Sequence, residues 1–172
     1  VINLKSIKKL LNSINKIDNC IISAPNLNKS TKSTNIKIVD NVIGANFLFD
    51  VKKIRKLKFF DEKFFLYWED VDLCHRINNT KYKIIINNKA KAKHLSSKSS
   101  HNNLNTFFIR NINFKFGEYL YFNKINKLKK IKPLRQIFTN LIYFLTNLLS
   151  LKFLKSLQNI AYILGIFKFI FR

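Results

Sequence analysis

Over its first 125 residues the chain alternates between two hydrophobic periodicities, and this alternation most restricts the fold it can adopt. Residues 2–17 repeat apolar side chains at helical spacing, with Lys and Asn between them, which predicts an amphipathic helix. The apolar run CIISAP at 20–25 predicts a buried strand. Further strands are expected within 36–49, at 82–87 and at 90–95, and further helices at 51–57, 69–78 and 106–125. Alternating short strands and helices predict an α/β domain.

The pattern changes at Pro133, because residues 134–172 contain no acidic residue. Two helices are expected there, the second over 152–170, and a thin polar stripe crosses the first at Gln136, Asn140, Asn147 and Ser150. Polar interruptions disfavour a membrane-spanning helix. The wide apolar face is typical of helices lying in an anionic membrane surface, as are Lys152, Lys155, Lys168 and Arg172. The alternative is a helical pair packed on its own domain. We therefore expect a C-terminal amphipathic helical extension over 126–172.

The net charge of +23 on 172 residues indicates an anionic partner. A nucleic-acid-binding module is disfavoured, because the basic residues are spread along the chain without a helix-turn-helix, zinc or RNP-like pattern. The hydrophobic fraction of 47% excludes a disordered tail. Cys20 and Cys74 lie in apolar segments without metal-ligand spacing, and we interpret both as reduced core residues of a cytosolic protein.

Five of the nine carboxylates lie within twelve residues of this basic chain, at Asp61, Glu62, Glu69, Asp70 and Asp72. An ordinary structural role would make them helix caps and surface pairs, such as Asp72 with Arg76 four residues later. The surrounding aromatic residues would instead raise carboxylate pKa values toward that of a general base. Adjacent helical carboxylates project about 100° apart, which does not suit a glycosidase pair. A single assisted base fits the pattern better, and a purely structural membrane-associated protein would leave the acidic cluster unexplained.

Several motifs in this region occur together in a known order. The stretch VIGANFLFDVKKIRKLKFFDEKFFLYWEDVDLCHRI, followed by YKIIINNKAKAKHLSSKSS, resembles the acceptor-side half of family 2 glycosyltransferases of the GT-A (Rossmann-like) fold, especially the rhamnosyltransferase-like group. The matching residues are Gly44, Ala45, Phe60, Asp61, Glu62, Phe64, Phe65, Glu69, Asp70, Asp72, Leu73, Arg76, His94 and Ser99. Lys58 departs from the family, which usually has glycine there. The resemblance implies a GT-A domain over 1–125.

The resemblance also implies roles for individual residues. Asp70 would be the catalytic base, and Glu69, Trp68, Gly44 and Ala45 would contact the acceptor, although Trp68 fits a core position equally well. Asp61 would support the loop around the site, and Asp72 and Arg76 would brace the helix or approach the diphosphate. His94 would contact a metal ion or the diphosphate, where a structural role is the alternative.

The implied reaction is inverting transfer of a sugar, rhamnose among the candidates, from a nucleotide-sugar donor to a saccharide or lipid-linked acceptor in cell-surface polysaccharide synthesis. A divalent cation, Mg²⁺ or Mn²⁺, would assist, with most of its ligands in a donor-binding half expected before residue 1. The lack of that half and of any methionine predicts that the chain is the C-terminal piece of a longer enzyme and transfers no sugar alone. The expected location is the cytoplasm, peripheral to the inner face of the plasma membrane.

Overall fold

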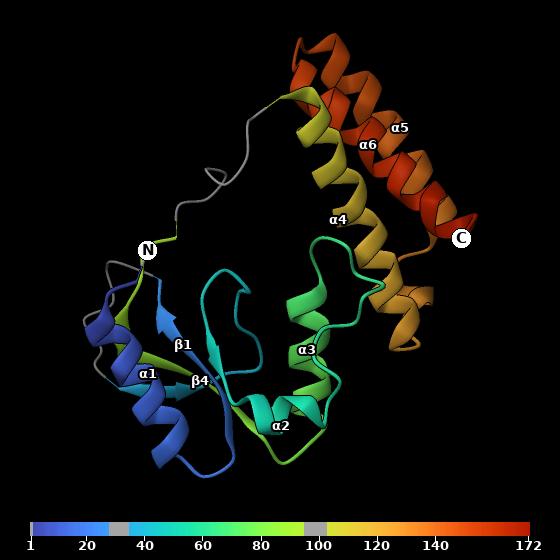
Figure 1. The fold of residues 1–172 in the computed structure, drawn as a ribbon. Helices are drawn as coiled ribbons and strands as arrows, with labels where there is room; N and C mark the ends of the chain where they lie inside the picture. The colour runs from blue at the N-terminus through green and yellow to red at the C-terminus, as the bar shows by residue number, and fades with distance from the viewer. Residues whose placement is uncertain (1, 28–34, 95–102) are drawn as a thin grey trace. The chain divides into compact units, whose positions relative to one another are not determined.

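A computed structural model describes residues 2–27, 35–94 and 103–172, which are mixed α/β with about 55% helix and 15% strand. The chain divides into two compact units (Figure 1). The sheet unit comprises the described parts of 1–61 and 69–99, and the helical unit comprises 62–68 and the described part of 100–172. The domain boundary expected after residue 125 came from the family resemblance. In the structure, the long helix that ends at Lys124 belongs to the same compact unit as the two C-terminal helices.

The sheet unit is built on four strands in the order β2-β4-β1-β3. The central pair, β1 (Cys20–Asn26) and β4 (Lys83–Lys91), is parallel, with Ile22 opposite Ile84. The short edge strands β2 (Ile36–Ile38) and β3 (Leu48–Phe49) run antiparallel to β4 and β1 respectively. Every residue of β1 is buried, which agrees with the buried strand predicted from CIISAP.

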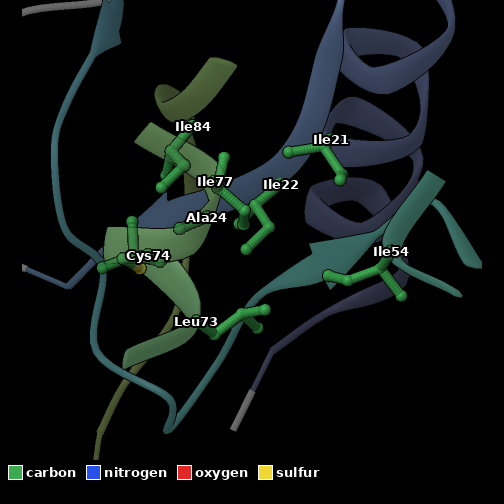
Figure 2. Close-up of a cluster of buried hydrophobic side chains, with 9 residues drawn as sticks. Ile21, Ile22, Ala24, Ile54, Leu73, Cys74, Ile77 and Ile84 are labelled. Atoms are coloured by element: carbon green, nitrogen blue, oxygen red, sulfur yellow. The ribbon is translucent and has the colours of Figure 1, made fainter. Parts of the chain in front are cut away.

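Helices cover both faces of this sheet. Helix α1 (Leu4–Lys16) packs on β1 and β4, where its Ile14 meets Cys20 and Ile85. Side chains alternate between the faces of a strand, so the neighbouring Ile84 points to the opposite face. There it joins the main apolar cluster with residues of α2 (Val51–Arg55) and α3 (Glu69–Asn78), shown in Figure 2.

The two cysteines are free and buried, which confirms their assignment to the core. Burial raises the pKa of the Cys20 thiol to about 11 and also raises the pKa of Cys74. Both thiols are therefore uncharged near neutral pH, when they behave as small apolar residues.

Two strand predictions were wrong in detail. Residues 36–49 form only the short strands β2 and β3, because a turn at Gly44 and Ala45 interrupts them. The two strands expected at 82–87 and 90–95 are replaced, over the described residues, by the single strand β4 (Lys83–Lys91). The expected break falls at Asn88 and Lys89, but the side chains of Asn88 and of Asn87 before it both find hydrogen-bond partners. Asn87 donates to Ser13 Oγ at 2.8 Å, and Asn88 donates to the Asn35 carbonyl at 2.7 Å.

The face of α1 that is buried also differs from the face predicted by the apolar residues at helical spacing over 2–17. Ser6 and Ser13 are buried beside Leu10 and Ile14, whereas Leu4 and Leu11 are exposed. The Ser6 hydroxyl accepts a hydrogen bond from the Lys91 backbone N–H at 3.0 Å. Hydrogen bonds from β4 to these two hydroxyls thus offset the cost of burying them.

The helical unit contains three long helices, α4 (Leu104–Lys124), α5 (Pro133–Leu149) and α6 (Phe153–Ile170), with the short 3-10 helix η1 (Leu128–Lys130) after α4. Helix α6 packs against both α4 and α5. Gly165 permits the approach to α4, because a Cβ there would lie 2.5 Å from the Ile112 carbonyl oxygen. Pro133 begins α5, where its missing N–H leaves no helical bond unmade.

Candidate active site

Helix α3 carries most of the acidic cluster, and its bounds, Glu69–Asn78, match the predicted helix. Glu69, Asp70 and Asp72 lie in its first turn, and His75 and Arg76 in its last. This distribution places negative charge at the positive end of the helix dipole and positive charge at the other end. The acids therefore favour helix formation here in addition to any chemical role.

Asp70 is held by two backbone N–H groups. Its Oδ2 accepts from Gly44 at 2.7 Å, and its Oδ1 accepts from Val71 at 2.8 Å. Gly44 does not have a positive φ; it is needed for close approach, because a Cβ there would lie 3.3 Å from both Cβ and Oδ2 of Asp70. A side chain at position 44 would therefore make a tight contact with Asp70, which would have to shift by a few tenths of an ångström. The structure thus joins two site residues that are 26 positions apart.

Asp72 and Arg76 form the predicted ion pair, with Arg76 Nε donating to Asp72 Oδ2 at 2.8 Å. The pair does not lie on the surface as expected, because the Asp72 side chain is only 1% exposed. Arg76 also donates to the carbonyls of Leu57 and Phe59. One guanidinium thus ties α3 to the turn that precedes the FDE motif, which is a bracing role.

That turn contains the position where the family usually has glycine. Lys58 and Phe59 both have left-handed backbone, with φ of 61° and 47°. Left-handed backbone favours glycine because the Cβ of an L-residue crowds the following carbonyl. The departure at Lys58 therefore places a strained residue in a turn that Arg76 holds together.

Glu69 lies in an environment that disfavours its charged form. Loss of hydration on burial raises its pKa, and the nearby Asp70 charge adds to the effect. Its Oε2 is buried and finds no hydrogen-bond donor within the described parts of the chain. The predicted rise in carboxylate pKa within the acidic cluster is therefore seen at Glu69, next to the proposed base.

Trp68 belongs to the helical unit and packs on α4 beside Phe114, Tyr121 and Phe122. Gly117 makes room for it, because a Cβ there would lie 2.9 Å from Trp68 Cδ1. Trp68 has a φ of 70° and its neighbour Tyr67 a φ of 67°, so two bulky residues adopt left-handed backbone in succession. These contacts account for Trp68 as a packing residue.

The remaining predicted site residues differ in their exposure. Asp61 is half-buried, Ala45 is exposed in the turn after Gly44, and His94 is exposed three residues after β4 ends. Among the residues that the structure describes, no three His, Cys, Asp or Glu side chains are grouped so that they could hold a metal ion. Ser99 lies outside the described residues.

A pocket of about 270 Å³ lies in the sheet unit and was not predicted. Its walls come from the end of β1 and the segment before Gly44; they include Pro25, Asn26, Leu27, Asn41, Val42 and Ile43. Ligands in α/β proteins commonly bind outside the carboxyl ends of parallel strands, where β1 ends here. Asn and aliphatic residues give no chemical motif, so only the end of the buried strand could have indicated this pocket.

Comparisons with known proteins found no match, whether with protein-family models, with curated proteins or with solved structures. Any functional assignment therefore rests on the residues of this chain and their arrangement.

Proposed function

We propose that this chain is the acceptor-side part of an inverting glycosyltransferase with a GT-A fold, and that Asp70 is its catalytic base. The motif order resembles that of family 2 enzymes. The observation that supports the proposal best is the carboxylate of Asp70, which two N–H groups hold against Gly44, a residue of the same motif set. Such fixed orientation is what a general base requires.

In the proposed reaction Asp70 accepts the proton of an acceptor hydroxyl as the oxygen attacks the anomeric carbon of the donor. The bond from that carbon to the nucleoside diphosphate breaks, and the diphosphate leaves with the electron pair. Each oxygen of Asp70 uses one lone pair for its N–H bond and keeps another for the hydroxyl. The two N–H donors hold the carboxylate in position without filling its capacity to accept a proton.

The other residues have supporting roles in this proposal. By the resemblance, Glu69 and Ala45 contribute to acceptor binding, whereas Trp68 is a packing residue on α4, and the Asp72–Arg76 pair braces the turn at 57–59. Asp61 supports the loop that follows. A divalent cation, Mg²⁺ or Mn²⁺, would neutralise the departing diphosphate. By the resemblance, His94 would contact this cation or the diphosphate.

The partners in this proposal are a nucleotide-sugar donor and a saccharide or lipid-linked acceptor. Lipid-linked acceptors would place the enzyme at the inner face of the plasma membrane. Nucleic acid has no role in it.

The test is sugar transfer by the intact protein as its gene encodes it. Membranes from expressing cells are supplied with labelled nucleotide sugars, and labelled saccharide or glycolipid is measured. Asp70→Asn should reduce turnover by about 10²–10⁴, with donor binding nearly unchanged, because the loss belongs to the transition state. Glu62→Gln is the matched control, because it removes one charge from an exposed residue of the same cluster. Absence of transfer from every donor, or more than a tenth of turnover in a folded Asp70→Asn variant, would overturn the proposal.

A further inference from the structure

Helix α5 exposes its apolar residues and buries a polar one. Leu134 and Leu149 are 80% and 85% exposed, and several further large apolar side chains along the helix are also exposed, namely Phe138, Leu141, Ile142, Leu145 and Leu148. Asn140 is the residue of α5 that is buried. Asn140 therefore turns inward, with Gln136 and Asn147 half-buried on the same stripe. A helix at the surface of a water-soluble protein instead turns its polar side outward.

Helix α6 shows the same inversion. Its buried residues are mostly small or polar; they are Ser156, Asn159, Ala161, Gly165 and Ile166. Phe153, Leu164, Phe167 and Phe171 are exposed. Their spacing of 11, 3 and 4 residues places them on one side of the helix, along its whole length.

The inward polar groups are satisfied within the helices themselves. Asn140 donates to the Gln136 carbonyl at 2.8 Å, and Asn159 donates to the Lys155 carbonyl at 2.9 Å. Ser156 bonds across the pair to the Phe144 carbonyl of α5 at 3.4 Å. Small and hydrogen-bonded polar residues between helices, with apolar residues outside, are typical of helices that contact lipid.

Charge distinguishes a lipid partner from a second copy of this chain. Residues 134–172 carry five cations and no acid; the cations are Arg135, Lys152, Lys155, Lys168 and Arg172. A second copy would bring five more positive charges to the same pair of helices, whereas anionic lipid headgroups attract positive charge.

The position of these charges indicates the orientation of α6. By length and composition alone, its 18 residues, with a mean hydropathy of 1.2, are long and apolar enough to cross a membrane. However, only the twelve residues 156–167 are free of charge, and they extend about 18 Å, less than the roughly 30 Å of bilayer hydrocarbon. The exposed apolar side of α6 runs from Phe153 to Phe171 and so extends beyond both ends of the uncharged stretch 156–167. Lys155 projects about 200° away from Phe153, close to the opposite side of the helix.

We propose that α5 and α6 lie in the plane of an anionic membrane, with the exposed apolar side of α6 and the adjoining side of α5 in the acyl region. Lys155 contacts the headgroups, as do Arg135, Lys152 and Arg172, whereas Lys168 donates to Asn113 Oδ1 of α4 at 2.9 Å. This placement does not depend on the proposed sugar transfer, because it follows from the helical unit alone.

The first test is flotation of the full chain, diluted from detergent, with vesicles of phosphatidylcholine containing phosphatidylglycerol. Leu164→Asp should weaken binding about tenfold or more, because it removes apolar burial and places a charge among acyl chains. Leu11→Asp is the matched control, because Leu11 on α1 is 47% exposed and Leu164 is 44% exposed. Leu141→Asp on α5 gives a second variant, and circular dichroism checks that each variant is folded.

Equal loss in the Leu11→Asp and Leu164→Asp variants would overturn the proposal, as would equal binding to vesicles of phosphatidylcholine alone. So would self-association that Leu164→Asp abolishes without any effect on flotation.

The second test measures depth with spin labels at Phe153→Cys, Ile160→Cys, Phe171→Cys and Lys155→Cys. The two native cysteines are buried. Helices lying in the plane should give similar depths at the first three positions and a shallower one at Lys155. A deep label at Ile160 with both end labels in water would indicate a spanning helix and overturn the in-plane orientation.

Discussion

The change Asp72→Asn tests whether the buried ion pair holds the start of α3 to the turn before it. The amide keeps the shape of the side chain but removes the charge opposite Arg76, whose Nε lies 2.8 Å from Asp72 Oδ2. Removing one partner of a buried pair costs about 3–5 kcal/mol, and a hydrogen bond to a charged group contributes about 1.5–3 kcal/mol. Arg76 is 22% exposed, so water offsets part of its loss. We expect Asp72→Asn to lower the free energy of unfolding by about 2–3 kcal/mol.

The measurement is urea unfolding in mild detergent, with melting curves alongside. For a chain of this size a loss of that magnitude lowers the melting temperature by about 4–12 °C. Glu62→Gln is the control, because it removes one carboxylate charge from an exposed residue and should change the free energy of unfolding by less than about 0.5 kcal/mol. A loss for Asp72→Asn no larger than that of Glu62→Gln would refute the reasoning, because the buried pair would then contribute no more than an exposed charge.

Two further changes test other features of the sheet unit. Glu69→Gln should stabilise the protein at pH 7. Burial raises the pKa of Glu69 in the folded protein above its ordinary 4.5. The free energy of unfolding therefore falls as the pH rises from 4.5 through the raised pKa, and glutamine removes this loss because it carries no charge. The gain should vanish below about pH 4, where the carboxyl is protonated in both states, and an equal gain in urea unfolding at both pH values would contradict this cause. Lys58→Gly should raise the free energy of unfolding by about 0.5–1 kcal/mol by relieving left-handed backbone, whereas Lys56→Gly, at a φ of −64°, should lower it. A loss at both positions would argue against strain at Lys58.

Local patterns predicted the elements whose residues interact mainly with near neighbours in sequence. The bounds of α3 followed from acids at its start and cations at its end, and the pair of Asp72 and Arg76 followed from their spacing of four. Burial of Asp72 did not follow from that spacing, nor did the bonds from Arg76 to the carbonyls of Leu57 and Phe59, which lie 19 and 17 residues earlier.

Predictions failed where a distant partner reverses the usual preference of a residue. Asn87 and Asn88 resemble the end of a strand, yet hydrogen bonds to α1 and to Asn35 carry the strand through them. Ser13 is inside for the same reason. The bond between Gly44 and Asp70 joins segments 26 residues apart, so no local pattern predicted that contact.

The division of the chain into units has a consequence for deletions. The helical unit includes residues 62–68, which reach it between two segments of the sheet unit, and there Phe64 packs with Phe116 and Leu120 of α4. A truncation that removed the C-terminal helices would keep Phe64 and Trp68 in the chain but remove the residues of α4 against which they pack. Such a shortened protein would expose new hydrophobic surface and aggregate. Limited proteolysis should accordingly cleave the chain within residues 62–68 more readily in any variant that lacks α4.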